Sequence, residues 1–568
     1  MELHRPPGWI TKLMASLISK SLWECIEGDL QEIYDQDVSD HGRRKANRKY
    51  FFHALGFLRF RRLRNSHYSL RRLYSDKTQI TMDLFSNYLK VSWRDLKRNK
   101  TFALINLTGL VAGFMACLLI LQYVFYETGY DRFHENPEEL YRVVNDRYQN
   151  GELVQHGMIT YPLVGKALAE DFPEVTSHTR LTTGGRNYIR RDDQLFMVDD
   201  FLFADEHFLD IFNFPIKEGL AATALDEPFE VVLTATFAER FLKTGEKPAD
   251  LIGQSVRIFT SGPACKISGI LEDIPANSHL QFDLLISFKS MVSLSGGSAN
   301  ESWRWSDFYH YVRLKPGTDT EVMNEKLADF GDKYFKNGEV SGSVEKFYLQ
   351  PLEDAHLYSD YEYEIGVVRN GKVVWAMLLT AIFLIVIAWV NFTNLSTSRA
   401  TERAREVGVR KSLGASGLQL FWQFLAEAVL INGIALILAI VLVFILGEPY
   451  RSLTGLPLSF SDLLATTSGG IPYVLLMIPV FLLCLIIISI YPASVMSGYR
   501  THDTLKGRSA GTRDAVGLRK GLVVFQFATA LLLVTGTFTL NRQIAYMQNK
   551  DLGMDMENNL VLFGPSMA

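Results

Sequence analysis

Five strongly apolar stretches, each about as long as a bilayer is thick, most constrain what this chain of 568 residues can fold into. A helix that crosses the hydrocarbon core of a membrane needs roughly 20 apolar residues. Between the first and second stretches lie 246 residues with the composition of an ordinary folded domain. We therefore expect a multi-pass membrane protein with one large inserted domain. The stretches cover residues 101–126, 373–398, about 418–447, about 471–491 and 521–541.

Charge indicates the orientation. Residues 41–100 hold 17 Lys and Arg against three acidic residues, and further basic runs follow the second and fourth stretches. Residues 127–371 reverse this balance, because 23 bases against 41 acids leave a net charge of −18. Basic loops stay on the cytoplasmic side, although a long domain can cross whatever its charge. If the stretches alternate in direction, the N-terminus is cytoplasmic, and the acidic block, the loop 448–470 and the C-terminus lie outside.

The inserted block combines strand and helix patterns. Residues 229–233 and 265–271 predict strands, residues 234–241 a short helix, and residues 318–335 one longer amphipathic helix. The expected fold class is an α-helical multi-pass membrane protein with an inserted α+β extracytoplasmic domain and a small helical cytoplasmic N-terminal domain. The expected divisions are the cytoplasmic domain, 1–80; a basic lead-in and first spanning helix, 81–126; the extracytoplasmic domain, 127–371; three spanning helices, 372–500; a linker and fifth spanning helix, 501–541; and the start of a second extracytoplasmic domain, 542–568.

The first 80 residues predict helices, and two interpretations of them stay open. Residues 43–64 mix aromatic residues with many Arg and Lys. This segment fits a basic amphipathic helix on anionic lipid, or a core-facing helix of a small cytoplasmic domain, and both can hold at once. The N-terminal 20 residues lack the apolar run of a signal peptide, so the first spanning helix is expected to be the uncleaved targeting signal.

Residues 512–541 repeat the basic-then-apolar pattern of residues 83–126. This repetition indicates either a truncated sequence that stops early in a second repeat, or a natural five-helix protein with a short outer tail.

Residues able to carry chemistry do not form a recognisable catalytic pattern. The histidines lack metal-ligand spacing, and the four cysteines are too dispersed over the expected topology for a disulfide framework. Residues 366–373 fit part of a phosphate-binding loop, but Val373 stands where a Ser or Thr must hold magnesium. We therefore expect no catalytic, cofactor-binding or metal-binding residues, no nucleic-acid partner and no ATPase activity of the chain's own. The cysteines are Cys25, Cys117, Cys265 and Cys484.

The segment 398–415 is the candidate functional element. Residues Glu402, Glu406 and Arg410 are spaced by four, so they share one helix face, and two glycines precede the next apolar stretch. The simpler interpretation is a charged membrane anchor. The interleaved acids favour instead a short amphipathic helix that acts as a lever on a cytoplasmic partner. The candidate coupling residues are Glu402, Arg403, Arg405, Glu406, Val407, Val409, Arg410, Lys411 and Gly414.

Three further residues within the apolar stretches are notable. Gly109 and Gly113 share one face of the first helix and allow close helix contact, either within the chain or between subunits. Glu427 lies in the third stretch, where an ionisable side chain is costly. It fits either a packing or gating contact, or a carboxylate near enough to the membrane surface to stay hydrated, and the second interpretation is favoured.

Several segments resemble the FtsX/MacB-type ABC transporter permeases. The most specific is the segment from Glu402 to Ala415, which is similar to the coupling segment of these permeases. The resemblance implies the long, two-repeat form with an N-terminal permease prefix domain, in an apparently truncated sequence. The other segments that carry it are residues 24–32, 96–110, 267–283 and 424–427.

The resemblance implies a permease subunit in the bacterial inner membrane, working as a dimer or as a pseudo-dimer of two repeats. A separate cytoplasmic ABC ATPase would use ATP and magnesium to drive export of peptides, lipoproteins or toxic small molecules, or mechanical work outside the membrane. The alternative is a non-transporting transducer that acts on a cell-envelope partner. The largely apolar spanning helices slightly favour action from outside the bilayer, and membrane lipids are the remaining expected partner.

Overall fold

The computed structural model describes residues 82–258, 262–336, 340–398, 400–454 and 513–550, with scattered residues between 31 and 50 and between 479 and 494. The chain divides into two compact units, Met1–Leu84 and Phe85–Ala568. In the first unit, Tyr34 and Tyr50 are buried with their rings 5.4 Å apart, and the Tyr34 hydroxyl donates to Asn47. Tyr50 therefore faces other protein atoms, as in a core-facing helix.

The apolar stretches form long helices. Among the described residues, four helices are long and apolar enough to cross a membrane, which agrees with four of the five expected spans. The expected span 471–491 lies almost wholly outside the described residues. A preceding helix, α5 (Met82–Arg98), is amphipathic and ends on basic residues. The long helices are α6 (Lys100–Thr128), α14 (Gly371–Ser398), α16 (Gly417–Thr454) and α19 (Arg513–Asn549).

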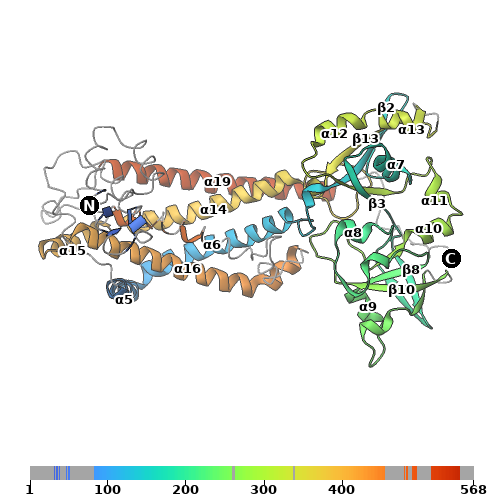
Figure 1. Cartoon of the computed structure of the whole chain (residues 1–568). Helices are drawn as coiled ribbons and strands as arrows, with labels where there is room; N and C mark the ends of the chain where they lie inside the picture. Colours follow the sequence, from blue (N-terminus) through green and yellow to red (C-terminus); the bar gives the residue numbers. More distant parts are fainter. Residues whose placement is uncertain are drawn as a thin grey trace. The chain divides into compact units, whose positions relative to one another are not determined.

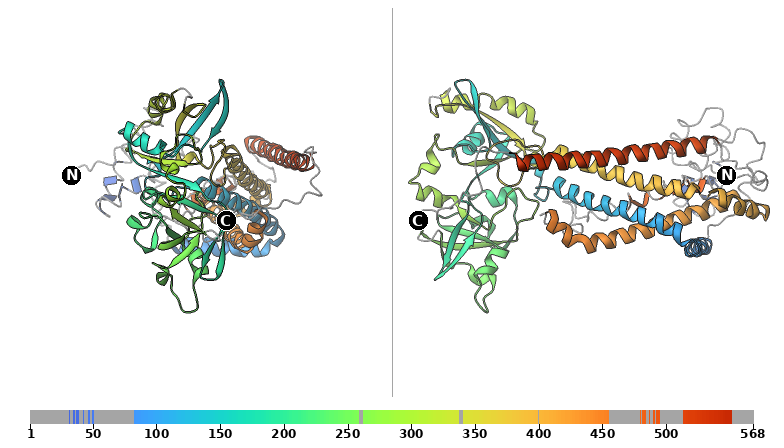
Figure 2. Two further views of the ribbon diagram at one scale, coloured as in Figure 1. Left: turned by 90° about the vertical axis from the view of Figure 1, so that its right-hand side faces the viewer. Right: turned by 180° about the vertical axis from the view of Figure 1, so that it is seen from behind.

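Helix α6 packs against both α14 and α16, and α19 runs along α14 (Figures 1 and 2). The two glycines of α6 face α14: a Cβ built on Gly113 would lie 2.6 Å from Ala388 Cβ, and one on Gly109 would lie 3.2 Å from Asn391 Nδ2. Both glycines thus serve packing within the chain, where small residues let two helices approach closely.

The inserted block contains one mixed sheet and short helices, which confirms the expected α+β class. The path of the sheet is β13-β1-β12-β3-β6-β11-β8-β10-β9-β4-β5, with β2 beside β1 and β7 beside β10. The strands are β1 (Leu140–Gln149), β2 (Glu152–Gly157), β3 (Val175–Thr183), β4 (Asn187–Arg191), β5 (Gln194–Val198), β6 (Phe201–Ala204), β7 (Ile216–Gly219), β8 (Glu230–Thr234), β9 (Ser255–Ile258), β10 (Ala264–Leu271), β11 (Leu284–Ser287), β12 (Tyr309–Leu314) and β13 (Val344–Pro351).

Short helices cover the sheet and bury its apolar side chains in three clusters. The single helix expected over 318–335 is two helices, α12 and α13, because the chain breaks near Asp329 and both pieces bury apolar residues in the same cluster. The helices are α7 (Val164–Asp171), α8 (Phe208–Phe212), α9 (Ala235–Phe241), α10 (Phe288–Leu294), α11 (Ser298–Glu301), α12 (Thr320–Leu327) and α13 (Phe330–Phe335), with 3-10 turns at Pro137–Glu139, Ala221–Thr223, Pro248–Leu251 and Leu352–Asp354.

The first and last strands of the inserted domain are neighbours. Tyr141 at the start of β1 pairs with Pro351 at the end of β13. The chain therefore enters the domain from α6 and leaves it toward α14 at adjacent positions of the sheet, and α6 and α14 are themselves in contact. We call residues 352–370, which join β13 to α14, the connector.

The two described cysteines, Cys117 and Cys265, are free thiols and both are buried. Burial raises the pKa of the Cys265 thiol to about 11. Cys265 belongs to the apolar cluster beneath β10, so it is not an exposed thiol of the domain.

Candidate functional site

The candidate coupling segment, 398–415, forms a helix between two spanning helices. Helix α15 covers Ala400–Ser412, and α16 begins at Gly417. Gly414 ends α15 with a φ of +99°, a backbone conformation open to glycine, and its N–H donates to the Lys411 carbonyl at 3.1 Å. Ser416 and Gln419 then form a reciprocal capping box at the start of α16. These contacts define a fixed corner, residues 413–416, between α15 and α16.

The two candidate valines lie on different faces of α15. Val407 is 2% exposed and packs with Leu420, Phe421 and Phe424 of α16. Val409, by contrast, is 47% exposed, and Leu413 at the corner is 84% exposed. The structure therefore separates a face that holds α15 to its own chain from a face that carries exposed apolar side chains.

The charged candidate residues also differ in their surroundings. Glu406 pairs with Arg410 at 2.6 Å, as their spacing predicts, and Arg410 donates to the Gln423 side chain at 2.9 Å. Burial lowers the pKa of Lys411. These contacts position α15 against the first turns of α16. The side chains of Glu402, Arg403 and Arg405 lie outside the described residues. Glu427 is half-buried on α16, and its two interpretations stay open.

A second polar cluster, which sequence reasoning missed, lies where α6 meets the inserted domain. Glu127 in the last turn of α6 is 1% exposed and contacts Nε2 of His356 from the connector. The ring of Tyr130 stacks on His356 with centroids 3.4 Å apart. Arg369 approaches Glu127 at 3.9 Å. We call the cluster of Glu127, Asp131, His134, His279 and His356 the junction.

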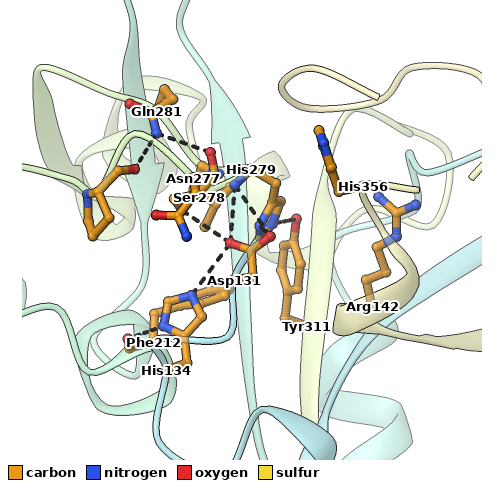
Figure 3. A network of polar contacts seen from close by, with 12 residues as sticks. Asp131, His134, Arg142, Phe212, Asn277, Ser278, His279, Gln281, Tyr311 and His356 are labelled. Carbon is orange, nitrogen blue, oxygen red and sulfur yellow. Dashed lines mark hydrogen bonds and ion pairs between the residues drawn. The ribbon is translucent and has the colours of Figure 1, made fainter. Parts of the chain in front are cut away.

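Asp131 is the second buried carboxylate of the junction and lies between His134 and His279 (Figure 3). Its oxygens accept from the His279 N–H at 3.1 Å and the Ser278 hydroxyl at 3.2 Å, and lie 2.9 Å from His279 Nδ1. Burial alone would raise the pKa of Asp131, but the imidazoles of His279 and His134 outweigh it and hold that pKa well below its usual range. Asp131 thus fixes the chain after α6 to the loop before β11.

The connector is held by a buried ion pair. Arg142 of β1 is 1% exposed and donates from both terminal nitrogens to the two oxygens of Glu364, at 2.5 and 2.8 Å. Its remaining N–H groups reach Gln350 and Ser359. A bidentate pair of this kind fixes geometry as well as charge. The connector therefore links the central sheet to the start of α14.

Several histidines and acids that are scattered along the sequence lie together in the structure. Among the described residues no group of three side chains is placed to hold a metal ion. Three histidines nevertheless converge on two buried carboxylates. His356 and Glu127 are 229 positions apart in sequence, so spacing gave no sign of their contact. The only local signal was the pair of acids, Glu127 and Asp131, directly after an apolar stretch.

Spanning helices with one large α+β domain inserted after the first define a class of polytopic membrane proteins. Within it, residues 103–330 match the MacB-like periplasmic core domain, and residues 378–499 match the FtsX-like permease C-terminal domain. The chain therefore belongs to the FtsX/MacB-type ABC transporter permeases. It is a membrane protein whose sheet domain is of the periplasmic type, as the resemblance implies.

Curated relatives match part of the chain. The pyoverdine export ATP-binding/permease protein PvdT of Pseudomonas savastanoi is 24% identical over 43% of this chain and 34% of its own length. The macrolide export ATP-binding/permease protein MacB of Burkholderia lata is 29% identical over 21% of this chain and 19% of its own. The chain thus spans about a third or less of these relatives. The solved periplasmic region of MacB from Actinobacillus actinomycetemcomitans is 12% identical, with a TM-score of 0.28, over 39% of this chain and 92% of that one.

Proposed function

We propose that this chain is the permease subunit of an ABC transporter and that α15 couples it to a separate cytoplasmic ATPase. The observation that carries the proposal is the exposed apolar face of α15, with Val409 and Leu413, on a short helix fixed between two spanning helices. Val409 and Leu413 are four positions apart and joined by a helical hydrogen bond, so they share one face. Contiguous exposed apolar side chains mark contacts with proteins or membranes. The matches to the MacB-like periplasmic core domain and to the FtsX-like permease C-terminal domain support the same assignment.

The place of residues 366–371 in the structure supports the proposal that a partner subunit hydrolyses ATP. Residues 366–370 are the end of the connector, where Gly366 packs on the backbone of His279, and Gly371 begins α14. A phosphate-binding loop lies instead between a strand and a helix of a soluble α/β domain. ATP and magnesium are accordingly assigned to the partner, and the permease to a dimer or a pseudo-dimer of repeats. Peptides, lipoproteins or toxic small molecules are the proposed substrates.

The alternative, a mechanical transducer acting on an envelope partner, is favoured by the junction. Two buried carboxylates, the connector and the Arg142–Glu364 pair tie the ends of α6 and α14 to the sheet. Movement of the helices would therefore reach the domain without a path for substrate through the membrane. Both functions require the same cytoplasmic contact.

The experiment distinguishes the role of the exposed face of α15 from that of its buried face. Val409→Asp and Leu413→Asp place a charge on the exposed face, so we expect both variants to insert and fold normally but to lose the ATPase that co-purifies with the wild-type chain from its own membranes. Val154→Asp is the matched control, because Val154 on β2 is 49% exposed, like Val409, but belongs to the sheet domain.

Val407→Asp is unsuitable for this purpose, since Val407 is buried against α16 and its loss would disturb the corner itself. Co-purification of the ATPase with both exposed-face variants at the wild-type level would show that α15 is only a charged anchor. If the ATPase is retained by the control and lost by the variants, a further measurement of export against envelope remodelling decides between transport and transduction.

A further inference from the structure

The number of hydrogens on the Glu127–His356 pair follows from the groups that contact the His356 ring. Nδ1 of His356 lies 2.7 Å from the carbonyl oxygen of Val367. A carbonyl oxygen only accepts, so Nδ1 carries a hydrogen and donates it. Nε2 on the other side of the ring contacts a carboxylate oxygen of Glu127. Both side chains are 1% exposed, so water does not separate them.

One proton must therefore lie between Nε2 and the carboxylate. Without it, a neutral imidazole would present a lone pair to a negative carboxylate, and both atoms would be acceptors. The proton can belong to an imidazolium that faces a carboxylate, or to a carboxylic acid that faces a neutral ring. In either form the pair is neutral and hydrogen-bonded, which a buried pair requires.

This pair lies where three segments meet. Glu127 closes the last turn of α6, and the neighbouring Tyr130 covers one face of the His356 ring. The carbonyl of His356 accepts from Arg369 N–H, and the carbonyl of Leu357 accepts from Gly371 N–H, both at 2.8 Å. Since Gly371 is the first residue of α14, His356 and the adjacent Leu357 together join the end of α6 to the beginning of α14.

We propose that Glu127 and His356 form a proton-dependent clasp between the extracytoplasmic ends of α6 and α14, which opens when the shared proton is lost. Rising pH removes the proton, leaves two facing acceptors in a buried site and frees the connector from α6. The clasp follows from the geometry of the pair and goes beyond the proposed transport function, which it does not require.

The other ionisable groups around the pair do not replace that proton. Tyr130 stays a neutral phenol, because burial, followed by its Tyr126 hydrogen bond and nearby carboxylates, raises its pKa far above the usual range. Tyr123 on α6 and Tyr450 on α16 are also phenols near this site, and Asp131 adds only negative charge. Arg369 is the one cation shown near Glu127 among the described residues, but it lies 3.9 Å from the other carboxylate oxygen and its side chain is 47% exposed.

Glu127→Gln keeps a hydrogen bond to His356 but removes its dependence on the shared proton. The amide N–H of Gln can donate to the bare Nε2 of a neutral His356, and its carbonyl can accept from an imidazolium, so the contact persists at any pH. His356→Gln is a second such variant, because its amide donates to the Glu127 carboxylate without a shared proton. Glu127→Ala removes the contact altogether. Glu135→Gln, at an exposed position on the same segment, is the control for the loss of one charge.

Hydrogen–deuterium exchange of the full chain in nanodiscs measures directly whether the clasp is closed, through the protection of the Arg369 and Gly371 amides. At about pH 6 the wild type, Glu127→Gln and Glu135→Gln should be equally protected. At about pH 8.5 the wild type and Glu135→Gln should exchange faster than Glu127→Gln by roughly tenfold or more, since an unpaired buried charge is strongly destabilising. Comparison at one pH cancels the intrinsic pH dependence of exchange.

Glu127→Ala should exchange fast at both pH values. Equal protection of wild type and Glu127→Gln at pH 8.5 would overturn the proposal. If Glu127→Gln fails to fold, the same comparison with His356→Gln decides. These measurements need neither ATPase nor substrate, so loss of the proposed transport function would leave the result for the clasp unchanged.

Discussion

Gly113 shows how much one missing side chain contributes to the membrane bundle. The gap between α6 and α14 at this level has no room for a methyl group, because its Cβ would lie 2.6 Å from Ala388 Cβ. The two-glycine pattern in the sequence predicted a close helix contact. It left open which helix is the neighbour, since an intersubunit seam and an internal one need the same small residues.

We expect Gly113→Ala to lower the free energy of unfolding by about 1–3 kcal/mol, the usual cost of overpacking a tight contact. Gly536→Ala on α19 is the matched control, because its Cβ would meet nothing within 4 Å and Ala is the better helix former. Thermal unfolding of both variants in one detergent provides the measurement. A Gly113→Ala variant as stable as Gly536→Ala would mean that α6 and α14 do not pack at this seam.

Helices and strands were predictable wherever they depend on a local pattern of apolar residues. Four of the five expected long helices, the strand and helix over 229–241, and the strand over 265–271 follow from apolar runs and periodicity, and the described residues contain them. The helix expected over 318–335 was wrong as a single element, because burial of Phe330 and Phe335 required a break near Asp329 that amphipathic spacing does not reveal. The α15 helix was predicted, but not which of its valines faces outward.

The connector is an element that the sequence did not predict. It lacks regular secondary structure over most of its length and depends on tertiary contacts, chiefly the pair between Arg142 and Glu364. Such a segment has no periodicity to detect. Its order comes from a buried arginine 222 positions earlier in the chain.

We expect Glu364→Ala to destabilise the domain by about 3–5 kcal/mol, because it leaves the Arg142 guanidinium buried and unpaired. The double variant Arg142→Met with Glu364→Leu should recover much of that loss, since replacing a buried pair by apolar residues is often nearly neutral. Glu170→Gln is the control: its partner Lys166 lies 3.8 Å away in an exposed pair, which contributes about 0–1 kcal/mol. A double variant no better than Glu364→Ala would show that the pair is not the source of the effect.

At the scale of the whole molecule, the order of spans and domain was predictable from composition alone. The neighbouring positions of β1 and β13 were not, because sheet order depends on pairings between distant strands. For the same reason the junction escaped prediction: one carboxylate lies in the last turn of α6 and the other just after it, while the histidines that contact them are His134, His279 and His356.

Orientation across the membrane is tested with an impermeant thiol reagent. Since Cys265 is buried with a raised pKa of about 11, it should stay unlabelled in the folded protein on either side. A cysteine at the 72% exposed position Leu220 should react in spheroplasts, whereas one at Ser412 should react only after the cells are opened. Labelling of position 412 in intact spheroplasts would reverse the assigned orientation.

The pairing of Tyr141 with Pro351 also bears on how the two ends of such a domain are tethered. Neighbouring strands lie about 4.8 Å apart, so the folded domain holds its entry and exit at a separation that a tight turn could span. For α6 and α14 the whole domain is thus equivalent to a short hairpin loop. The entropy of closing a loop of more than 200 residues is lost when the domain folds, and the two helices then meet as if joined directly. Excising the domain and inserting a few turn residues should accordingly leave a helical hairpin that still pairs, which makes the domain a module that can be exchanged independently of the membrane bundle.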